Sequence, residues 1–431
     1  MRRTALLAAA TSALVAVGCA DARPPSDEGA GDGSIEVFGP WLGADADAFA
    51  DSVEGFVERT GIEVRYTGSL DVVSDLRGRL DGALAPPDVA VIPQAGFVDD
   101  LAAQEAIVAF SDDVATAVRA DFPDSTLEVD DAGELRAFPY RTVVKSLVWH
   151  RPDLFAQRGW SVPRSLDELT ALVELVETSS DLAPWCFGVS SGDDTGWPAT
   201  DWVEDLVVRR AGAEVYDEWR RGERGFSDPA IRSAHEEFAD LVLSGGRSAG
   251  GATRVLGTEL GSIPGPLLDD EPGCAMFKQA SFATVWFDDD VEIGPDGDVD
   301  VFVLPGVDPD APAPIIVGND SVVQFVDADA VDRLVAYLAS PEGAAAWARR
   351  GGYLSSRSSI DVDRYHQPED RRLARLLAQR RTMRPDASDG FASSYRDEVL
   401  ERTTAWIAGA IELDELVADL DGARPPETGG G

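Results

Sequence analysis

Short β-forming runs alternate with longer amphipathic runs from Ser34 onward, and this alternation restricts the possible folds more than any other feature. The β-forming runs are residues 34–38, 62–66 and 88–92, and the amphipathic runs between them are residues 46–59 and 72–84. Strands that alternate with helices are typical of an α/β fold with largely parallel strands. Ligands of open α/β sheets bind beyond the carboxyl ends of the strands, so the loops after these runs are the first candidates for a binding site.

The rest of the chain continues the α/β pattern and ends in helices. A long β-rich run at 138–149 precedes a helix at 165–177, for which Ser165 is the expected N-cap and Glu168 its capping-box partner. The later expected elements are a second α/β region at 183–291, strands at 299–304 and 315–326, helices at 328–339 and 341–349, and a mostly helical, charged stretch to residue 420. At 431 residues, the chain is long enough for two domains.

The charge of the chain excludes several classes of partner. The sequence holds 78 acidic and 37 basic side chains, for a formal net charge of −41. Such a surface repels phosphate backbones and anionic lipid headgroups, and it offers no basic stripe that would release counterions. We therefore expect no nucleic-acid partner, and contact with the membrane only through a lipid anchor.

The first residues resemble an export signal. Two arginines precede an uncharged run of small and apolar residues that is too short to span a membrane, and Cys19 follows where secretory signals are cleaved. This cysteine resembles the lipobox cysteine of bacterial lipoproteins, although Ala16 replaces the usual leucine. We expect residues 1–18 to be a signal peptide and residues 19–33 a flexible tether with Cys19 lipidated. A plain signal peptide with an incidental cysteine is the alternative.

The remaining cysteines form an even pair. Once Cys19 is assigned to the lipid, Cys186 and Cys274 are left. In an exported chain such a pair is read as a disulfide. Two free, buried thiols are the alternative.

Motifs with a consistent order and spacing extend from about residue 34 to 355. They are Gly39-Pro40-Trp41 after the first strand, Phe56 followed by Thr60-Gly61-Ile62, Pro87-Asp88-Val89, Phe138-Pro139-Tyr140 before Leu147-Val148-Trp149-His150, Pro163 with Ser165-Leu166-Asp167-Glu168-Leu169, Cys274-Ala275-Met276 before Ser281-Phe282, and Ser340-Pro341-Glu342-Gly343 with Trp347. Together they resemble the extracellular solute-binding proteins of bacterial ABC importers, in the carbohydrate branch that includes maltose-binding protein. The stretch from Trp185 to Trp202 is most similar to the α-glucoside-binding branch.

This resemblance implies an α/β, two-lobed periplasmic-binding-protein-like fold with interleaved lobes joined by a hinge. Lobe 1 would comprise residues 34–143 and 310–350, lobe 2 residues 144–309 and 351–421, and a disordered tail residues 422–431. The hinge crossings would fall near residues 142–145, 304–313 and 349–352. Both lobes would therefore be discontinuous in sequence.

The resemblance also implies a sugar in the cleft between the lobes. A sugar presents hydroxyls around a weakly apolar C–H face, so its site needs flat aromatic side chains and groups that form two hydrogen bonds. We expect Trp197 or Trp202 to stack on a sugar ring while Asp201 binds its hydroxyls. Tryptophans are mostly buried on average, so core packing is the alternative for each of them and is the favoured role of nearby Trp185.

Other candidates are polar or aromatic residues near the expected cleft. Lys145, one of only two lysines in the chain, lies in the expected hinge strand. The run Gly318-Asn319-Asp320-Ser321 places polar groups in an otherwise apolar strand, where they are costly unless paired. The complete set of expected ligand-binding residues is Trp41, Asp88, Gln94, Lys145, Trp197, Asp201, Trp202, Ser281, Phe282, Asn319, Asp320 and Tyr353. Surface or turn roles are the alternatives for Trp41, Asp88 and Tyr353.

The sequence contains no recognisable catalytic motif. The three histidines, His150, His235 and His366, are far apart and no nucleophile elbow accompanies them. Acidic runs at 288–290 and 296–300 lack the spacing and terminal glutamate of an EF-hand, so we expect neither a metal nor a cofactor. Because paired carboxylates arise by chance among 78 acidic side chains, a secreted glycoside hydrolase remains only as an alternative, with a surface adhesin as a third possibility.

The expected function is therefore ligand capture without catalysis. We expect a monomeric lipoprotein, exported to the outer face of the cell membrane, that captures an α-glucoside or gluco-oligosaccharide by hinge closure. It would deliver this small-molecule carbohydrate to the transmembrane permease subunits of an ABC transporter.

Overall fold

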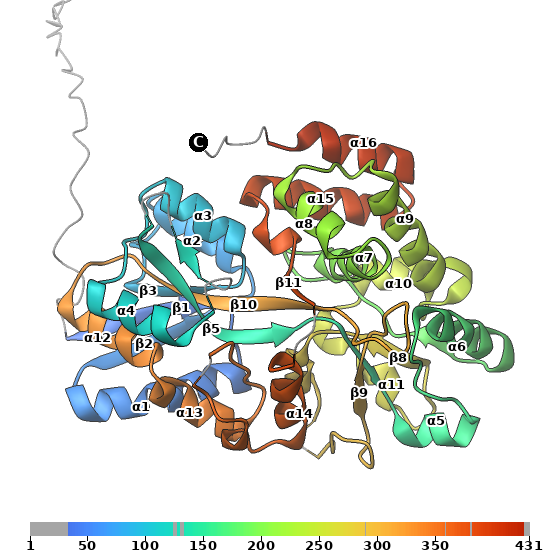
Figure 1. The fold of residues 1–431 in the computed structure, drawn as a ribbon, viewed down its shortest axis with the longest axis horizontal. Coiled ribbons are helices and arrows are strands. Elements are labelled where there is room, and N and C mark those ends of the chain that lie inside the picture. The colour runs from blue at the N-terminus through green and yellow to red at the C-terminus, as the bar shows by residue number, and fades with distance from the viewer. Residues whose placement is uncertain are drawn as a thin grey trace, which may run out of the picture.

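A computed structural model describes residues 33–123, 127–129, 133–288, 290–357, 359–379 and 382–425. These residues form two α/β lobes that lie side by side, each with its own sheet, and two long strands run from one lobe toward the other (Figure 1). The two-lobed α/β fold expected from the sequence is confirmed. The expected signal peptide, Cys19 and nearly all of the tether lie outside the described residues. Within the described part, no helix combines the length and apolar character that a membrane crossing requires.

The sheet of the first lobe has the strand order β2-β1-β3-β10-β5-β4, with β11 paired to β10. Its strands are β1 (Ser34–Gly39), β2 (Glu63–Gly68), β3 (Val89–Ile92), β4 (Glu128–Val129), β5 (Leu135–Val144), β10 (Ile315–Gln324) and β11 (Met383–Pro385). The pairings of β1 with β2 and β3 are parallel, as the alternation predicted, whereas β10 runs antiparallel to β3 and β5. The carboxyl ends of β1, β2, β3 and β5 therefore all point toward the second lobe.

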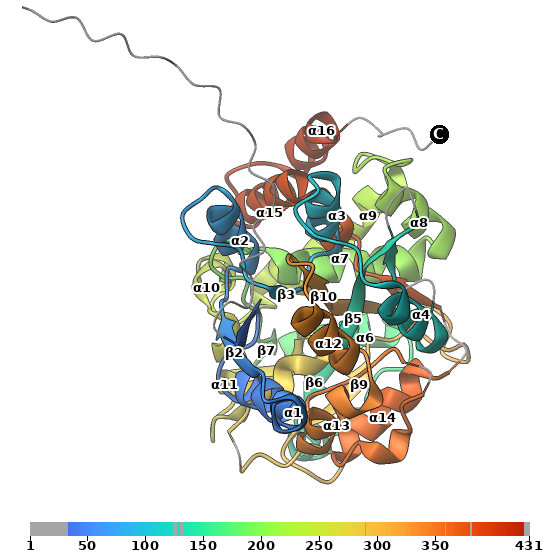
Figure 2. The same cartoon turned by 90° about the vertical axis from the view of Figure 1, so that its left-hand side faces the viewer.

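Helices cover both faces of this sheet (Figure 2). They are α1 (Ala44–Thr60), α2 (Val72–Leu80), α3 (Ala95–Ala103), α4 (Asp112–Asp121), α12 (Asp329–Leu338) and α13 (Pro341–Arg350). Alternate residues of β1 reach opposite cores: Val37 packs in the cluster that contains Phe49 of α1, and Phe38 packs with Leu76 of α2 and Phe97 of α3. The period of two in the strand thus supplies both hydrophobic layers.

The second lobe surrounds a smaller sheet of order β7-β8-β6-β9. Its strands are β6 (Leu147–His150), β7 (Ala183–Trp185), β8 (Cys274–Lys278) and β9 (Asp300–Val303), and its helices are α5 (Pro152–Arg158), α6 (Leu166–Ser179), α7 (Trp197–Arg210), α8 (Ala213–Arg221), α9 (Pro229–Phe238), α10 (Gly251–Gly257), α11 (Gly265–Leu268), α15 (Ser393–Ile407) and α16 (Leu413–Ala423). Ser165 caps α6 as expected, because its hydroxyl accepts from the Glu168 backbone N–H at 3.1 Å. The Glu168 carboxylate, however, accepts from Arg164 N at 2.8 Å.

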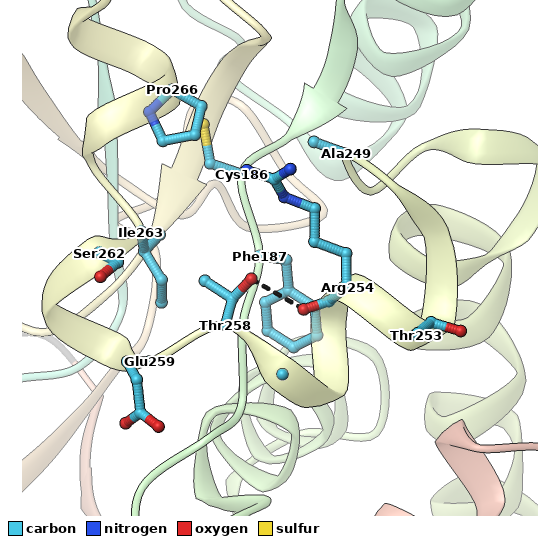
Figure 3. Close-up of a pocket in the computed structure, with 11 residues that line it drawn as sticks. Cys186, Phe187, Ala249, Thr253, Arg254, Thr258, Glu259, Ser262, Ile263 and Pro266 are labelled. Atoms are coloured by element: carbon cyan, nitrogen blue, oxygen red, sulfur yellow. Dashed lines mark hydrogen bonds between the residues drawn. The ribbon is translucent and has the colours of Figure 1, made fainter.

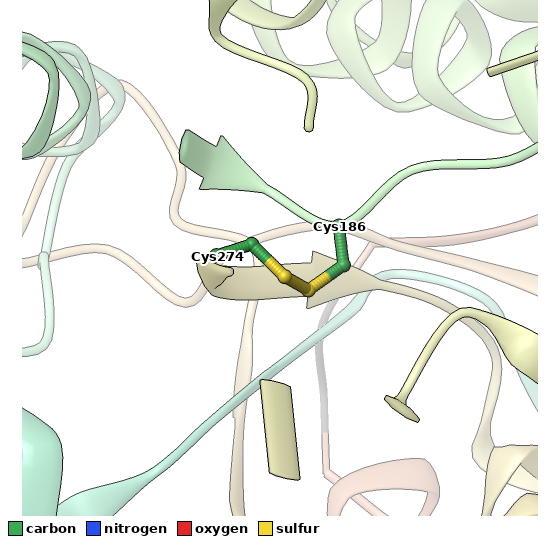
Figure 4. Close-up of a disulfide and its surroundings, with 2 residues drawn as sticks. All are labelled: Cys186 and Cys274. Atoms are coloured by element: carbon green, nitrogen blue, oxygen red, sulfur yellow. A yellow bond between two sulfur atoms is a disulfide. The ribbon is translucent and has the colours of Figure 1, made fainter. Parts of the chain in front are cut away.

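Cys186 and Cys274 are joined as a disulfide in the second lobe, which is the pairing expected from the sequence (Figure 4). Their Cα atoms lie 5.4 Å apart. Cys274 is the first residue of β8 and Cys186 directly follows β7, so the bond links these two parallel strands where they lie side by side. It also fixes the start of the loop that leads to α7.

The expected run at 138–149 divides into β5 and β6 at Lys145 and Ser146, where the chain passes between the lobes. Both residues form hydrogen bonds to the ends of the segment that joins β9 to β10. Lys145 N donates to Ile316 O at 2.9 Å, and Leu304 N donates to Ser146 O at 2.9 Å. The chain therefore passes between the lobes at residues 145–146 and between β9 and β10.

The third crossing differs from the expectation at 349–352. Residues 351–357 pack against the first lobe: Tyr353 Oη donates to Tyr140 O at 2.6 Å, and Thr142 N donates to Leu354 O at 2.9 Å. The chain reaches the second lobe only through β11, after α14 (Pro368–Leu377). The range expected for the second lobe, 351–421, follows from the crossing that the family resemblance implies near 349–352, and helical, charged sequence does not reveal which sheet a segment covers.

The C-terminal boundary also differs from the expected tail at 422–431. Helix α16 extends to Ala423, and Arg424 Nη2 donates to Trp219 O at 2.8 Å. Residues 422–424 therefore belong to the second lobe. Residues 426–431 lie outside the described part.

Candidate functional site

The loops that follow the strands of the two sheets meet between the lobes. The first lobe contributes the loops after β1, β2 and β3, and the second contributes the loops after β7 and β8. Direct contacts join them: Asp193 N of the loop before α7 donates to Asp71 Oδ1 of the loop before α2 at 3.0 Å. This interlobe region is where ligands of open α/β sheets are expected to bind.

A buried cationic side chain, Lys145, lies at the centre of this region. Its Nζ lies 2.6 Å from Asp386 Oδ2, 2.8 Å from Asp389 Oδ2 and 3.4 Å from Asp201 Oδ1, and its side chain is 9% exposed. Burial alone would lower the pKa of Lys145, but these carboxylates and Glu204 raise it well above its usual value. The raised pKa favours the charged ammonium, which ties the hinge strand to the third crossing and to α7.

The carboxylates around Lys145 respond differently to burial. Burial raises the pKa of Asp201 to about 8, although the Lys145 ammonium opposes this rise. Burial also acts to raise the pKa of Asp386, but the adjacent ammonium outweighs it and the pKa is lowered. Asp386 is therefore the main counter-ion of Lys145.

Aromatic side chains lie beside this charged group. Trp197, the first residue of α7, is partly exposed, and its ring centre lies 5.5 Å from Lys145 Nζ and 6.2 Å from the Phe282 ring. Phe282 in turn packs on Trp286 at 5.6 Å. A partly exposed aromatic surface next to charged hydrogen-bonding groups has the chemistry that a sugar ring and its hydroxyls require.

Two further expected residues, Asn319 and Ser281, lie along the hinge strands. Thr142 Oγ1 donates to Asn319 Oδ1 at 2.9 Å, and Val144 N donates to Ser281 Oγ at 3.2 Å. The Asn319 side chain is partly exposed, whereas Ser281 is buried. Ser281 therefore lies at the end of β5, next to Lys145. Asn319 follows Gly318 and points to the other face of β10, because the Cβ position of Gly318 lies 3.0 Å from Lys145 Cε.

Gln94, expected from its position after β3, makes a direct hydrogen bond to the second lobe. Its Nε2 donates to Asp194 Oδ2 at 3.2 Å. Asp194 also accepts from Arg396 Nη1 of α15. No sequence pattern singles out Asp194 or Arg396.

Trp41 and Asp320 belong to the packed interior of the first lobe. Trp41 is 1% exposed, and its Nε1 donates to Asp320 Oδ2 at 2.9 Å. Arg141 Nε donates to the same carboxylate oxygen at 2.7 Å and Arg141 Nη1 to Asp45 at 2.7 Å. The polar run in β10 is therefore paired within the lobe at Asp320, and Trp41 offers no open face for stacking.

Three other expected residues also lie in the framework. Asp88 precedes β3 at its amino end, where its Oδ2 accepts from Glu36 N at 2.8 Å. Trp202 is 1% exposed and packs edge-on against Trp185 at 4.9 Å. Tyr353 is equally buried beneath Tyr140. Position along the chain does not reveal which way a side chain points, so the sequence alone does not separate these residues from those that face the site.

Asp386, Asp389 and Arg396 are the site residues that the sequence analysis missed. They come from the third crossing and the start of α15, about 240 residues from Lys145 in the chain. The local signal was the acidic turn Asp386-Ala-Ser388-Asp389-Gly390, which lies between β11 and α15. Without the strand pairing of β11 there is no reason to place this turn beside the hinge.

One cavity opens between the lobes. It has a volume of about 430 Å³ and lies next to the loop that carries Trp197. It is lined by Asp71, Val73, Ser74, Arg77, Asp193, Asp194, Thr195, Asp397, Leu400, Glu401 and Thr404. Among the residues that the structure describes, no group of histidine, cysteine or carboxylate side chains is arranged to hold a metal ion.

A second cavity, of about 470 Å³, lies within the second lobe beside the disulfide (Figure 3). Its lining includes Cys186, Arg254, Thr258 and Glu259. It has no lining residue from the first lobe and none from the Lys145 cluster, so closure of the lobes does not form it. We therefore place the candidate site in the interlobe region.

Comparisons with known proteins identify the family of this chain. A family model for bacterial extracellular solute-binding proteins matches residues 51–369. The alpha-glucosides-binding periplasmic protein AglE of Rhizobium meliloti is 33% identical over 83% of this chain and 79% of its own length. The osmoprotective compounds-binding protein GgtB of Synechocystis is 32% identical over 82% and 84%. The solved structure of the bacterial solute receptor AcbH, which prefers β-D-galactopyranose, superposes with a TM-score of 0.76 over 90% of this chain and 96% of its own, at 17% identity. The chain thus belongs to the family of bacterial extracellular solute-binding proteins.

Proposed function

We propose that this protein is the sugar-binding subunit of an ABC importer. It captures an α-glucoside or gluco-oligosaccharide between its lobes and delivers the sugar to transmembrane permease subunits. The observation that carries this proposal is the partly exposed Trp197 ring, 5.5 Å from the Lys145 ammonium in the interlobe region. A sugar ring would stack on Trp197 while Lys145 and Asp389 form hydrogen bonds to its hydroxyls.

The relatives support a carbohydrate as the ligand. AglE, named for alpha-glucosides, is similar to this chain over most of the length of both proteins. The solute receptor AcbH, which has a similar fold at 17% sequence identity, also binds a sugar.

Capture would proceed without making or breaking a bond. The ligand shifts the population of open and closed forms only to the extent that it binds the closed form better. A ligand that contacts Gln94 of the first lobe and Trp197 of the second lobe binds the closed form better than the open form. Desolvation of the site on closure strengthens each hydrogen bond within it.

The location of the protein is part of the same proposal. Cleavage before Cys19 and lipidation of its thiol would hold a monomer at the outer face of the cell membrane. Two acyl chains provide stable anchoring, whereas one gives marginal binding. Cys19→Ser should release the protein into the medium or periplasm, and continued membrane association of this variant would contradict the anchor.

A thermal-shift panel tests the ligand class. Maltose, trehalose, sucrose and related sugars should raise the melting temperature in at least one case, because a ligand that binds only the folded state stabilises it. Trp197→Ala should abolish this shift, whereas Trp406→Ala, a tryptophan of the second lobe that packs on His235 and Phe238, should retain it. Silence across sugars, with a response to peptides or polyamines, would contradict the proposal.

The same samples test the hydrolase alternative. A binding protein releases no reducing ends from a gluco-oligosaccharide during prolonged incubation. Release that disappears when one carboxylate is replaced would establish hydrolysis instead.

A further inference from the structure

A continuous series of polar contacts connects the hinge to the first lobe through the second. Lys145 Nζ lies 2.8 Å from Asp389 Oδ2, Asp389 Oδ1 lies 3.6 Å from Arg396 Nε, Arg396 Nη1 donates to Asp194 Oδ1, and Gln94 Nε2 donates to Asp194 Oδ2 at 3.2 Å. We call these five residues the interlobe relay. It joins the end of β5, the third crossing, α15, the loop before α7 and the loop before α3.

The interlobe relay is largely removed from solvent. Arg396 is 4% exposed and Gln94 is 6% exposed. Arg396 Nε and Gln94 Oε1 are buried without a hydrogen-bond partner among the described residues. The relay therefore has one unused hydrogen-bond donor and one unused acceptor. Charge pairs in such surroundings interact more strongly than exposed pairs, and breaking one leaves a costly unpaired charge.

Arg396 also belongs to the helix on which the Trp197 loop rests. The loop reaches α7 through Gly196, whose φ of 116° favours glycine. A Cβ on Gly196 would lie 2.9 Å from Thr404 Oγ1 and 3.0 Å from Leu400 O, both in α15. The loop is therefore held against α15 by close packing near Gly196 and by the Arg396 pair at Asp194.

The exposed interlobe contacts nearby contribute less. Arg77 Nη1 lies 3.0 Å from Asp397 Oδ2, but the two side chains are 38% and 51% exposed. Pairs of this kind contribute little to stability and are screened by salt. The less exposed Gln94–Asp194 bond, which Arg396 supports from within the second lobe, is screened less than this pair. Ser393 N also donates to Asp100 Oδ2 of α3 at 2.9 Å, so the polar coupling between the lobes is shared.

We infer that Arg396 is a positioning residue: it holds the Trp197 loop in place and, through Asp194 and Gln94, favours the closed arrangement before a ligand arrives. The inference rests on the proposed function in that closure matters for capture. The relay itself operates in the ligand-free protein. It lowers the cost of ordering the loop when the sugar binds, which is the general benefit of a preorganised site.

Interlobe energy transfer in the ligand-free protein tests this inference. Fluorophores on cysteines at the exposed positions Glu58 of α1 and Glu174 of α6, in a Cys19→Ser background, report lobe separation. Arg396→Gln should lower the transfer efficiency and weaken the affinity for the best sugar by on the order of tenfold or more, mostly through faster dissociation. Arg402→Gln is the matched control. Arg402 lies on the same helix and pairs with Glu398 at 2.6 Å and with Asp419 of α16 at 3.4 Å, both in the second lobe, so neither quantity should change.

Asp194→Asn provides an independent variant if Arg396→Gln does not fold. It keeps the size of the side chain, lies in a loop, and should reproduce the lower transfer efficiency. Unchanged efficiency in every folded relay variant would overturn the inference. A lower efficiency in a protein that binds no sugar would support the inference while contradicting the proposed function, so the two failures are distinguishable.

Discussion

Replacement of Lys145 by methionine is the sharpest test of the buried charge cluster. Methionine keeps an unbranched side chain of similar length but removes the ammonium. Three carboxylates, those of Asp201, Asp386 and Asp389, then lose their common partner at 3.4, 2.6 and 2.8 Å. The Lys145 side chain is 9% exposed, so water does not replace the lost contacts.

The magnitude follows from the burial of these groups. Removing one partner of a buried ion pair costs about 3–5 kcal/mol, because an uncompensated charge remains in the interior. We expect Lys145→Met to lower the free energy of unfolding by this amount at pH 8. Arg402→Met, which removes an exposed guanidinium, should leave the unfolding midpoint unchanged.

The pH dependence of this loss has a definite sign. Burial already raises the pKa of Asp201 to about 8, with Lys145 opposing the rise, so removal of the ammonium raises the pKa further. A carboxyl whose pKa is raised by folding contributes stability that is fully present below its unfolded value, near 3.9, and is lost as the pH rises through the folded value. The variant should therefore lose less stability at pH 5 than at pH 8.

Urea unfolding of wild type and variant at the two pH values, followed by circular dichroism, measures this difference. A loss of the same size at both pH values would show that the carboxylates are not the groups that respond. A loss below about 1 kcal/mol at pH 8 would refute the reasoning altogether, because so small an effect is typical of exposed pairs.

Three further predictions concern other parts of the fold. Cys186→Ala with Cys274→Ala should lower the unfolding free energy by about 2–4 kcal/mol, and unchanged urea midpoints with and without reductant in the wild type would contradict a stabilising disulfide. Burial lowers the pKa of His235 to about 4, so the stability that its neutral ring contributes is lost as the pH falls from about 6.5 to 4, by about 3 kcal/mol in all. His235→Gln should therefore reduce the pH dependence of the melting temperature between these pH values. An unchanged pH dependence would contradict this prediction. Gly96→Ala places a Cβ 1.8 Å from Phe391 O and should cost about 1–3 kcal/mol by separating α3 from the third crossing, whereas Gly78→Ala of α2, with no atom within 4 Å, should cost nothing; equal melting temperatures for the two variants would contradict the close approach.

Local patterns in the sequence predicted much of the fold. The first three strands and the N-cap at Ser165 follow from alternation and capping chemistry, and both are present. The division of the 138–149 run into two strands was not predictable, because Lys145 and Ser146 interrupt the strand only through their bonds to Ile316 and Leu304. Sequence periodicity carries no information on such distant partners.

The candidate site was predictable only in part, for the same reason. Lys145 and Asp201 were both expected, and the structure brings them together. Trp41 was expected to face the cleft, but an aromatic residue after a strand can also turn into the core, where its Nε1 pairs with Asp320. The choice depends on Arg141, which neutralises that carboxylate from the neighbouring strand.

The central claim is that a sugar closes the two lobes, and interlobe energy transfer during a sugar titration tests it most directly. With fluorophores at Glu58→Cys and Glu174→Cys, the sugar that gives the largest thermal shift should raise the transfer efficiency, and the rise should saturate at the same concentration as the heat of binding. Trp197→Ala should show neither change. Binding heat without any change in transfer efficiency, or no response to any sugar, would contradict capture by closure.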